Sequence, residues 1–367
     1  MNIVYLDNAA TTPLSPAAKQ AIIDNLDEFG NPSSVHELGR RAKIKIEESR
    51  EKIADIINAD PGEVLFTSGA TESNNWALSQ SWYDYKFISN VEHPSIYNIY
   101  IGSDNIEVDK DGVIRDASWR PYSNLYNFLT SIMMVNNELG TINPIKELCE
   151  TVHKNDGRFH CDLTQAIPHM KVDIKTLAVD TASFSAHKFN GPKGVGVLFE
   201  KQGYGIDPLI FGGKQEFEKR AGTENVLGII AMAEALEDTV LNMDETNQKI
   251  TYLSTLLEEN VFNITGVYDN VLAPKSSRIP GIFNLRIDGC RGSDIVALAG
   301  EYGICISAGS ACHSGDPKPS YVLKAMGLTD EQALSSVRIS IGRFNGEQDV
   351  KYFCEMFPKI IEQLRFV

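Results

Sequence analysis

Short apolar runs alternate with helical patterns through the first two thirds of the chain. Strand-like apolar runs occupy positions 64–67, 86–89, 131–135, 181–185 and 195–199. A helical pattern begins after the first of them and covers residues 71–78. Strands that alternate with helices are typical of α/β domains, in which helices cover both faces of a sheet. We therefore predict a large α/β domain with a mainly parallel sheet.

The pattern changes in the last third of the chain. Helical patterns are followed there by strand-like alternation of apolar and polar residues, at 228–241, 247–259, 282–287 and 336–341. This order predicts a smaller α+β domain, joined to the first by the long helical stretch. We place the large domain at residues 14–245. The small domain takes residues 246–367, together with an N-terminal arm of residues 1–13.

The composition narrows the class of protein. The chain has 367 residues, 43% of them hydrophobic and 23% charged, as in ordinary globular proteins. No apolar run approaches the roughly 18 residues of a membrane helix, and the N-terminus lacks a basic stretch followed by an apolar one. The net charge of -15 disfavours binding to a phosphate backbone. We expect a cytoplasmic protein that binds neither membranes nor nucleic acid directly.

Six cysteines are scattered along the chain, and no two form a Cys-x-x-Cys pair. We therefore predict no metal site. Cys161 and Cys305 lie inside apolar runs, and we expect both to be buried as small apolar residues. Cys312 differs because it follows the small residues GSA at 309–311. This setting suits a nucleophilic thiol on a mobile loop.

The segment SGATES at 68–73 connects a predicted strand to a predicted helix. Its small residues let backbone amides approach a ligand, the helix N-terminus adds free N–H groups, and Thr71 adds a hydroxyl. These features are typical of a phosphate-binding cup. The alternative is a helix cap, in which Thr71 and Glu72 only satisfy the first turn.

Further polar groups follow predicted strands, where ligands of open α/β sheets bind. Asp162 could pair with a protonated ring nitrogen of a cofactor, with Gln165 near a ring oxygen, or it could cap a helix. His93 could stack on a flat cofactor or be structural. Asn136 and Asn137 could reach a ligand or only form a turn.

Lys188 lies in the run SFSAHKFNGPKG at 183–194. A lysine is an amine nucleophile only when its pKa is lowered, and a site crowded by a cofactor and His187 would lower it. Taken alone, Lys188 would be an exposed lysine in a Gly-Pro loop. Together with the thiol of Cys312, it suggests a Schiff-base lysine for pyridoxal phosphate in chemistry that ends in attack by sulfur.

Taken together, these segments resemble the fold-type I pyridoxal phosphate enzymes, and among them the long-loop, class V aminotransferase-like cysteine desulfurases. The resemblance covers nearly the whole chain, and it implies a seven-stranded, mainly parallel sheet. The order and spacing of the motifs make it specific. They are YLDNAATTP at 5–13, GNPSS at 30–34, GATES at 69–73, EH at 92–93, VNNE at 135–138, DLTQ at 162–165, SAHK at 185–188, RAGT at 220–223, GSAC at 309–312 and SVRISIGR at 336–343.

The resemblance implies a role for each matching residue. The implied catalytic residues are Lys188, Cys312 and His93. The residues implied for holding pyridoxal 5'-phosphate are Ala70, Thr71, His93, Asn137, Asp162, Gln165, Ser185, His187, Lys188 and Thr223. Thr223 is expected to reach the cofactor of the other subunit, which implies a homodimer. Substrate binding is implied for Asn8, Asn137 and Arg338, whose planar guanidinium suits a carboxylate.

The implied reaction converts L-cysteine to L-alanine and leaves a persulfide on Cys312, which carries sulfur, or transiently a cluster, to a protein acceptor. A scaffold for iron–sulfur cluster assembly and a tRNA-thiolation enzyme are the candidate acceptors. Only 55 residues follow Cys312, without the C-terminal extension of many long-loop relatives, which weakens the scaffold prediction. His313 could assist Cys312 as a base or only line the loop. A selenocysteine lyase and a class V aminotransferase of the same fold remain alternatives, whereas Lys188 disfavours a non-catalytic protein.

Overall fold

The computed structural model describes residues 3–100, 105–115, 127–308 and 318–365. Among these residues the large sheet has seven strands, as the resemblance implies. In order across the sheet they are β2 (Val64–Thr67), β8 (Gly196–Glu200), β7 (Thr181–Ser185), β6 (Arg158–Asp162), β5 (Phe128–Ser131), β3 (Tyr85–Ser89) and β4 (Asn105–Ile106). Only β8 runs antiparallel to its neighbours, so the sheet is mainly parallel, as predicted.

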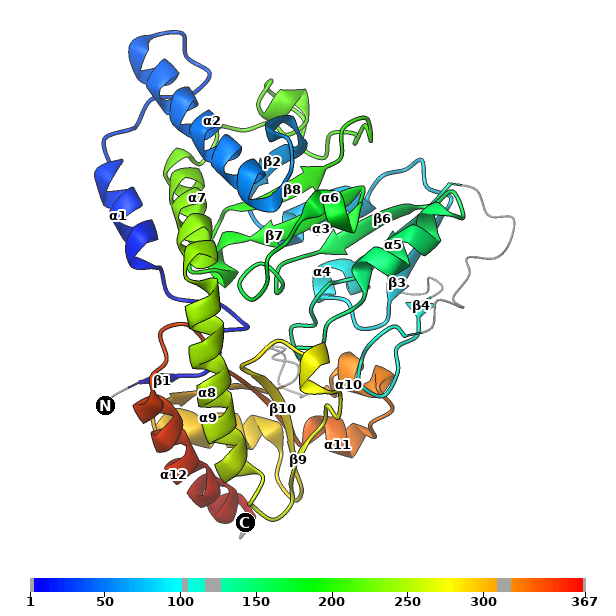
Figure 1. The fold of residues 1–367 in the computed structure, drawn as a ribbon, viewed down its shortest axis with the longest axis vertical. Coiled ribbons are helices and arrows are strands. Elements are labelled where there is room, and N and C mark those ends of the chain that lie inside the picture. The colour runs from blue at the N-terminus through cyan, green and yellow to red at the C-terminus, as the bar shows by residue number, and fades with distance from the viewer. Residues whose placement is uncertain (1–2, 101–104, 116–126, 309–317, 366–367) are drawn as a thin grey trace.

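Helices cover both faces of this sheet (Figure 1). Successive strand residues point to opposite faces, and in β2 Leu65 and Phe66 accordingly belong to different core clusters. The Leu65 face is covered by α3 (Ala70–Leu78) and α4 (Pro94–Tyr97). The Phe66 face is covered by α1 (Pro16–Asp24), α2 (Glu37–Ile57), α5 (Ile145–His153), α6 (Ile174–Leu177) and α7 (Val226–Leu241).

A second hydrophobic core forms from the C-terminal third of the chain and the N-terminal arm. Its antiparallel sheet has the order β12 (Ser307–Ala308), β13 (Ser336–Ser340), β10 (Ile282–Ile287) and β9 (Val267–Asp269). Three long helices pack on it, α8 (Met243–Val261), α9 (Gly292–Glu301) and α12 (Glu347–Arg365), and two short ones, α10 (Tyr321–Ala325) and α11 (Asp330–Leu334), lie at its side. This unit has the α+β composition predicted for the last third.

Two connections join the two cores (Figure 1). α7 and α8 are separated only by Asn242, so together they form a column that runs from the large sheet to the small one. The N-terminal arm forms β1 (Val4–Tyr5), which pairs in parallel with β11 (Ile304–Cys305). The arm then reaches the large sheet, where the Thr12 N–H donates to the carbonyl of His187 at 2.9 Å. The exact domain boundaries stay a prediction.

Two details of the sequence-based prediction are wrong. The strand expected at 131–135 is β5 and ends at Ser131. The N–H groups of Ile132 and Met134 still donate to the carbonyls of His160 and Asp162 on β6 at 3.1 and 3.0 Å, but the chain then enters the turn closed by Asn136 and Thr141. Cys305 is half-buried rather than buried, whereas Cys161 is buried as expected. In the pair β1–β11, Val4 and Ile304 face the core, so the next residue of each strand faces away from it.

Candidate active site

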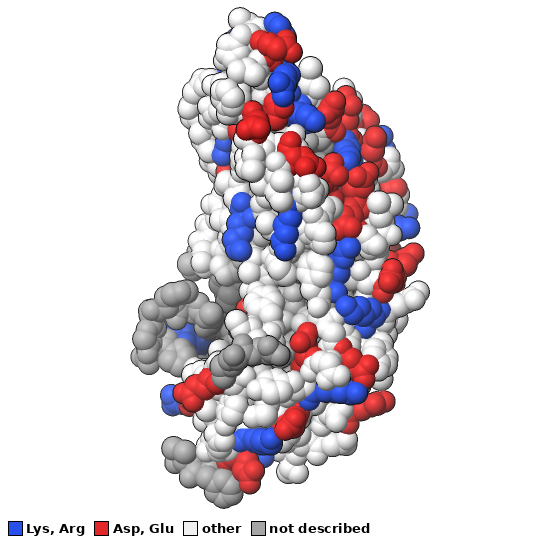
Figure 2. Space-filling model, turned by 90° about the vertical axis from the view of Figure 1, so that its left-hand side faces the viewer, with Lys and Arg blue, Asp and Glu red and all other residues white. Residues whose placement is uncertain are grey.

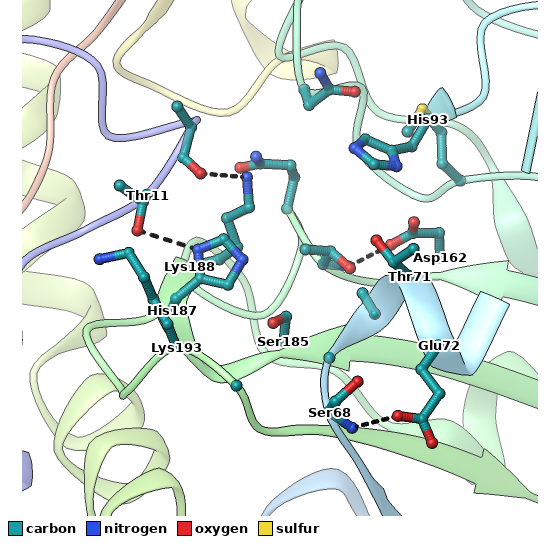
Figure 3. Close-up of a pocket in the computed structure, with 18 of the residues that line it drawn as sticks. Thr11, Ser68, Thr71, Glu72, His93, Asp162, Ser185, His187, Lys188 and Lys193 are labelled. Atoms are coloured by element: carbon teal, nitrogen blue, oxygen red, sulfur yellow. Dashed lines mark hydrogen bonds between the residues drawn. The ribbon is translucent and has the colours of Figure 1, made fainter. Parts of the chain in front are cut away.

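A cavity of about 480 Å³ opens at the carboxyl ends of the parallel strands (Figure 3). Its walls come from the segments that end or follow β2, β3, β5, β6 and β7 and from the N-terminal arm. The ends of neighbouring parallel strands meet at one edge of the sheet, and this topology explains why distant motifs converge. The predicted residues that line the cavity are Ala70, Thr71, His93, Asn137, Asp162, Gln165, Ser185, His187 and Lys188.

The cup forms where β2 gives way to α3. Gly69 caps the helix with a φ of 151°, a backbone conformation that only glycine adopts readily. Gly196 on β8 allows the close approach, because a Cβ there would lie 2.6 Å from the Cα of Gly69. No side chain caps α3, so its first N–H groups and its dipole are available to an anion.

The carboxylate of Glu72 anchors the cup from its outer side. It accepts a hydrogen bond from the Ser68 N–H at 2.8 Å and pairs with Arg220, whose Nε and Nη2 lie 2.8 and 3.1 Å from its two oxygens. Glu72 is thus held away from the helix N-terminus by a cation. The first turn of α3 therefore keeps its anion-binding capacity.

Lys188 ends the short helix η3 (Ala186–Lys188), and its amine donates to the carbonyl oxygens of Ala9 and Ala10 at 2.5 and 2.9 Å. Burial lowers the pKa of Lys188 to about 8, and the nearby Arg338 acts in the same direction. At pH 7 roughly a tenth of this amine is therefore uncharged, far more than of an ordinary lysine. Only the uncharged amine can attack a carbonyl.

His187 and Lys193 stand beside this amine in Figure 3. The Nδ1 of His187 lies 3.1 Å from the hydroxyl of Thr11, and burial, followed by the charges of Lys188 and Lys193, lowers the pKa of His187 to about 4. His187 is therefore neutral at pH 7 and acts here through hydrogen bonds. Lys193 lines the cavity and adds positive charge on the side of the cup.

Asp162 ends β6, and its carboxylate is held from two sides. Its Oδ1 accepts from the N–H of Thr164 at 2.8 Å and its Oδ2 from the Nδ2 of Asn74 at 2.9 Å. The residue is 4% exposed and still lines the cavity. A buried carboxylate fixed in this way favours a cationic partner, such as a protonated ring nitrogen.

His93 caps α4, and its ring nitrogen Nδ1 accepts from the backbone N–H of Ser95 at 3.1 Å. The ring lines the cavity opposite Lys188 in Figure 3. Burial lowers the pKa of His93, with Asp162 opposing and Lys188 reinforcing this shift. The ring is therefore neutral at pH 7, and its flat face is available to a flat ligand.

Arg338 lies on β13 and points across to the large sheet. Its Nη2 pairs with Asp7 at 2.8 Å, and its Nη1 donates to the carbonyl of Asn137 at 3.0 Å. The residue is 9% exposed, and its Nε has no hydrogen-bond partner within the described part of the chain. An unpaired buried donor is costly, so Arg338 retains a donor for a further anion.

The remaining predicted residues are placed less centrally. Gln165 lines the cavity and donates to the carbonyl of Ala9 at 2.8 Å. The amide of Asn8 is instead bonded to Ser340 at 2.8 Å and lines a separate cavity of about 40 Å³. Thr223 is exposed and does not line the main cavity. Cys312 and His313 lie outside the described residues.

Sequence reasoning missed several residues of the site, and three of them bear on its charge or on the charged groups in it. They are Lys193 in the cavity wall, Asp7 on Arg338 and Asn74 on Asp162. The Gly-Pro-Lys-Gly run around Lys193 was a usable signal, since glycine-rich loops often line ligand sites. Asp7 and Asn74 can be identified as site residues only from contacts between segments that are distant in the chain.

Comparisons with known proteins place this chain in a family. The family model for aminotransferase class-V matches residues 4–353. A cysteine desulfurase IscS of Dictyoglomus turgidum is 40% identical over 99% of this chain and 96% of its own length, and one from Methanosarcina thermophila is 38% identical over 99% and 93%. A solved NifS-like protein from Rickettsia africae has a TM-score of 0.89 at 33% identity and covers 98% of this chain and all of its own.

The chain therefore belongs to the class V aminotransferase family and, within it, to the group of the cysteine desulfurases. These enzymes depend on pyridoxal phosphate, and the fold agrees with that of the solved NifS-like proteins. Within the described residues, no helix is long and apolar enough to span a membrane, and no group of three His, Cys, Asp or Glu could hold a metal ion.

Acidic and basic side chains are mixed on the face of the molecule shown in Figure 2.

The cavity fits pyridoxal phosphate by its donor set. An uncapped helix N-terminus would take the phosphate, with Ser185 nearby, since a Cβ at Gly69 would lie 3.3 Å from its hydroxyl. The amine of Lys188 would meet the carbonyl carbon, and the carboxylate of Asp162 a protonated ring nitrogen. These groups stand on different walls of one cavity, as a ligand with three distinct ends requires.

Proposed function

We propose that this protein converts L-cysteine to L-alanine and collects the sulfur on Cys312 as a persulfide. The observation that carries the proposal is the amine of Lys188, whose pKa is lowered to about 8 in a cavity that also holds Asp162. The overall step is balanced. The C–S bond of cysteine is replaced by C–H, and the thiol of Cys312 becomes S–SH, so no outside oxidant is needed.

The side chains divide the work between them. When bound, pyridoxal phosphate supplies a carbonyl carbon that condenses with amines and a ring that accepts an electron pair. Lys188 accepts the α-proton of the substrate, because its amine is uncharged in a useful fraction of molecules near neutral pH. Arg338 binds the substrate carboxylate, either through its Nε, which has no partner among the described residues, or by exchanging Asp7 for the substrate.

The thiol of Cys312 takes the sulfur by attack of its thiolate on the substrate sulfur. The test is turnover of cysteine by the purified protein with pyridoxal phosphate and a reductant, measured as alanine and sulfide. Cys312→Ser should lose sulfide formation and retain the absorbance change on adding cysteine. Full turnover by Cys312→Ser would instead favour a selenocysteine lyase or an aminotransferase.

We further propose a homodimer in which Thr223 reaches the phosphate of the partner subunit's cofactor. Thr223 is exposed, and exposed apolar side chains lie close by in sequence and space, among them Phe211 at 83% exposed. The side chain of Gln215 bonds Ser33 at 3.4 Å, so this segment lies beside the loop that carries Phe29, itself 78% exposed. Exposed apolar groups of this size usually mark an interface.

Mixed dimers test this arrangement. Lys188→Ala and Thr223→Ala subunits, inactive or weak alone, should regain activity when mixed. In one site of each hybrid, the intact Lys188 comes from one subunit and the intact Thr223 from its partner. No recovery in hybrids shown to form by sedimentation would contradict the shared site.

The acceptor of the persulfide sulfur is proposed to be a protein. A scaffold for iron–sulfur cluster assembly and a tRNA-thiolation enzyme are the two candidates. Labelled sulfur on the persulfidated enzyme should move to the true acceptor and stay on the enzyme in the presence of the other.

A further inference from the structure

Asn74 is fully buried on α3, and every hydrogen-bonding position of its amide is occupied. Its Nδ2 donates to Asp162 and to the hydroxyl of Ser95, both at 2.9 Å. Its Oδ1 accepts from the hydroxyl of Ser183 and lies 3.0 Å from the Nε2 of His160. An amide has two N–H donors and two lone pairs, so none is left over.

The orientation of this amide follows from its partners. A flipped Asn74 would place its carbonyl oxygen against the carboxylate of Asp162, where two acceptors would face each other without a proton between them. It would also place its NH₂ group at the hydroxyl of Ser183. The orientation that donates to Asp162 is therefore the one that its carboxylate oxygen, as an acceptor, selects.

His160 is fixed by the same amide. Burial lowers the pKa of His160 to about 4, with Asp162 opposing, so the ring is neutral and carries one N–H. Its Nε2 faces the oxygen of Asn74, which can only accept, so the proton lies on Nε2. Its Nδ1 then accepts from the hydroxyl of Thr181 at 2.9 Å.

His93 is fixed through Ser95. The hydroxyl of Ser95 accepts from Asn74, so its own proton points to the Nδ1 of His93 at 2.8 Å. The same nitrogen also accepts from the backbone N–H of Ser95. Two donors thus face Nδ1, which disfavours a proton on it and leaves the single ring proton on Nε2.

We propose that Asn74 is a positioning residue of the active site, whose one amide holds Asp162 and Ser95 together and thereby sets the proton positions of His93 and His160. The parts that concern pyridoxal phosphate rest on the proposed function. The ring-nitrogen partner and the stacking histidine are then oriented by one side chain. A loss of Asn74 should disturb both at once, although it touches neither cofactor nor substrate.

The test compares Asn74→Ala with Asn270→Ala in the full chain. Asn270 is a matched control, because its buried Nδ2 also donates two hydrogen bonds, to Asn284 and Ser336 at 2.8 Å each, but in the small sheet. Two quantities are measured without cysteine. They are the dissociation constant of pyridoxal phosphate from the cofactor-free protein, and the pH at which His93 takes up a proton, by NMR of nitrogen-labelled histidine.

We expect Asn74→Ala to weaken cofactor binding by roughly 10- to 100-fold, the usual cost of a hydrogen bond to a charged group. The ring of His93 should be protonated at a higher pH than in the unchanged protein, because the Ser95 hydroxyl can then turn and accept a proton from Nδ1. Asn270→Ala should change cofactor binding by no more than about twofold.

If Asn74→Ala fails to fold, Ser183→Ala provides a milder test of the same hydrogen bonds. It keeps the amide and removes one donor from its oxygen, so cofactor binding should weaken by roughly two- to tenfold. The inference is overturned if a folded Asn74→Ala or Ser183→Ala binds cofactor like the unchanged protein and leaves the titration of His93 unmoved. If these shifts appear but cysteine is not converted, the proposed function fails and the role of Asn74 stands.

Discussion

Two buried arginines show how differently two regions of this molecule use charge. At the outer edge of the large sheet, Arg50 is bonded to both oxygens of Glu216 at 2.8 Å and to Glu47 at 3.0 Å. Between the two cores, Arg338 holds one oxygen of Asp7 and one backbone carbonyl. The side chains are 3% and 11% exposed, so burial does not distinguish them. The two arginines differ in how many of their N–H groups have hydrogen-bond partners.

The pair of Arg50 and Glu216 also completes the sheet. β2 is an edge strand, and its outward groups would otherwise lack partners. Glu216 accepts from the N–H of Phe66 at 2.7 Å, and Arg50 donates to the carbonyl of Val64 at 2.5 Å. Glu216 opens a run of three left-handed residues, with φ of 46°, 58° and 67°. Left-handed backbone at non-glycine residues costs energy. This conformation brings the carboxylate of Glu216 to the edge of the sheet.

The contrast shows that a buried arginine is suited to bind a ligand only if some of its hydrogen-bonding groups are still available. Four hydrogen bonds engage all three nitrogens of Arg50, so its role is structural. The Nε of Arg338 has no partner among the described residues, and in the proposed function a substrate carboxylate replaces Asp7, the partner of Nη2. The following variants separate the two regions by measuring stability and activity side by side.

The largest effect on activity is expected from Lys188→Ala in the main cavity. Production of alanine and sulfide should fall below detection, because no other amine contacts the carbonyls of Ala9 and Ala10 within the described residues. The free energy of unfolding of the cofactor-free protein should not fall, because a buried charge is removed. A marked loss of unfolding free energy would show that the charge of Lys188 stabilises the fold, as that of Arg50 does.

The next largest effect is expected at the edge of the sheet. Arg50→Met leaves the carboxylate of Glu216 buried without its cation, which should cost about 3–5 kcal/mol of unfolding free energy in chemical denaturation. Turnover per folded, cofactor-loaded molecule should stay within about twofold. A large loss of turnover at unchanged stability would reverse the assignment of this pair.

A smaller effect is expected from Arg338→Met. The KM for cysteine should rise by roughly 10- to 100-fold, the cost of a lost charge-assisted hydrogen bond. Unfolding free energy should change less than in Arg50→Met, since Arg338 is only partly paired. Steady-state kinetics and denaturation of the same preparations check both, and an unchanged KM would exclude Arg338 from carboxylate binding.

The smallest effect, taken per pH unit, is a pH dependence of stability. The pKa of Lys188 is about 8 in the fold and about 10.5 in an unfolded chain, so between these pH values the unfolded chain binds more protons. The stability of the cofactor-free protein should therefore rise with pH across this window, by up to about 1.4 kcal/mol per unit. Lys188→Met should lack this contribution, and parallel stability curves for both proteins would contradict it.

The sequence placed the strand-end residues well for a topological reason. Asp162, His93 and Lys188 each end or follow a strand, and parallel order brings those ends to one edge whatever the details of the loops. Their roles needed the resemblance to a known family, because an isolated lysine or histidine in a loop has several ordinary explanations.

The parts that escaped prediction are contacts between segments far apart in the chain. Asn74 lies 88 residues from Asp162, and Arg50 lies 166 residues from Glu216. Neither periodicity nor turn chemistry carries information over such distances. The end of β5 was misplaced for the opposite reason, since the apolar run at 131–135 continues past the last ladder pair into a buried turn.

The N-terminal arm sets an order of assembly during synthesis. Ala9 and Ala10, whose carbonyls hold the amine of Lys188, precede every strand of the large sheet in the chain. The arm that carries them pairs with β11, and Asp7 bridges to Ser340 on β13, near the other end of the chain. The large sheet can form while the ribosome still holds the last third. The site that it carries is completed only after β11 and β13 have been made, because the arm is held by both strands.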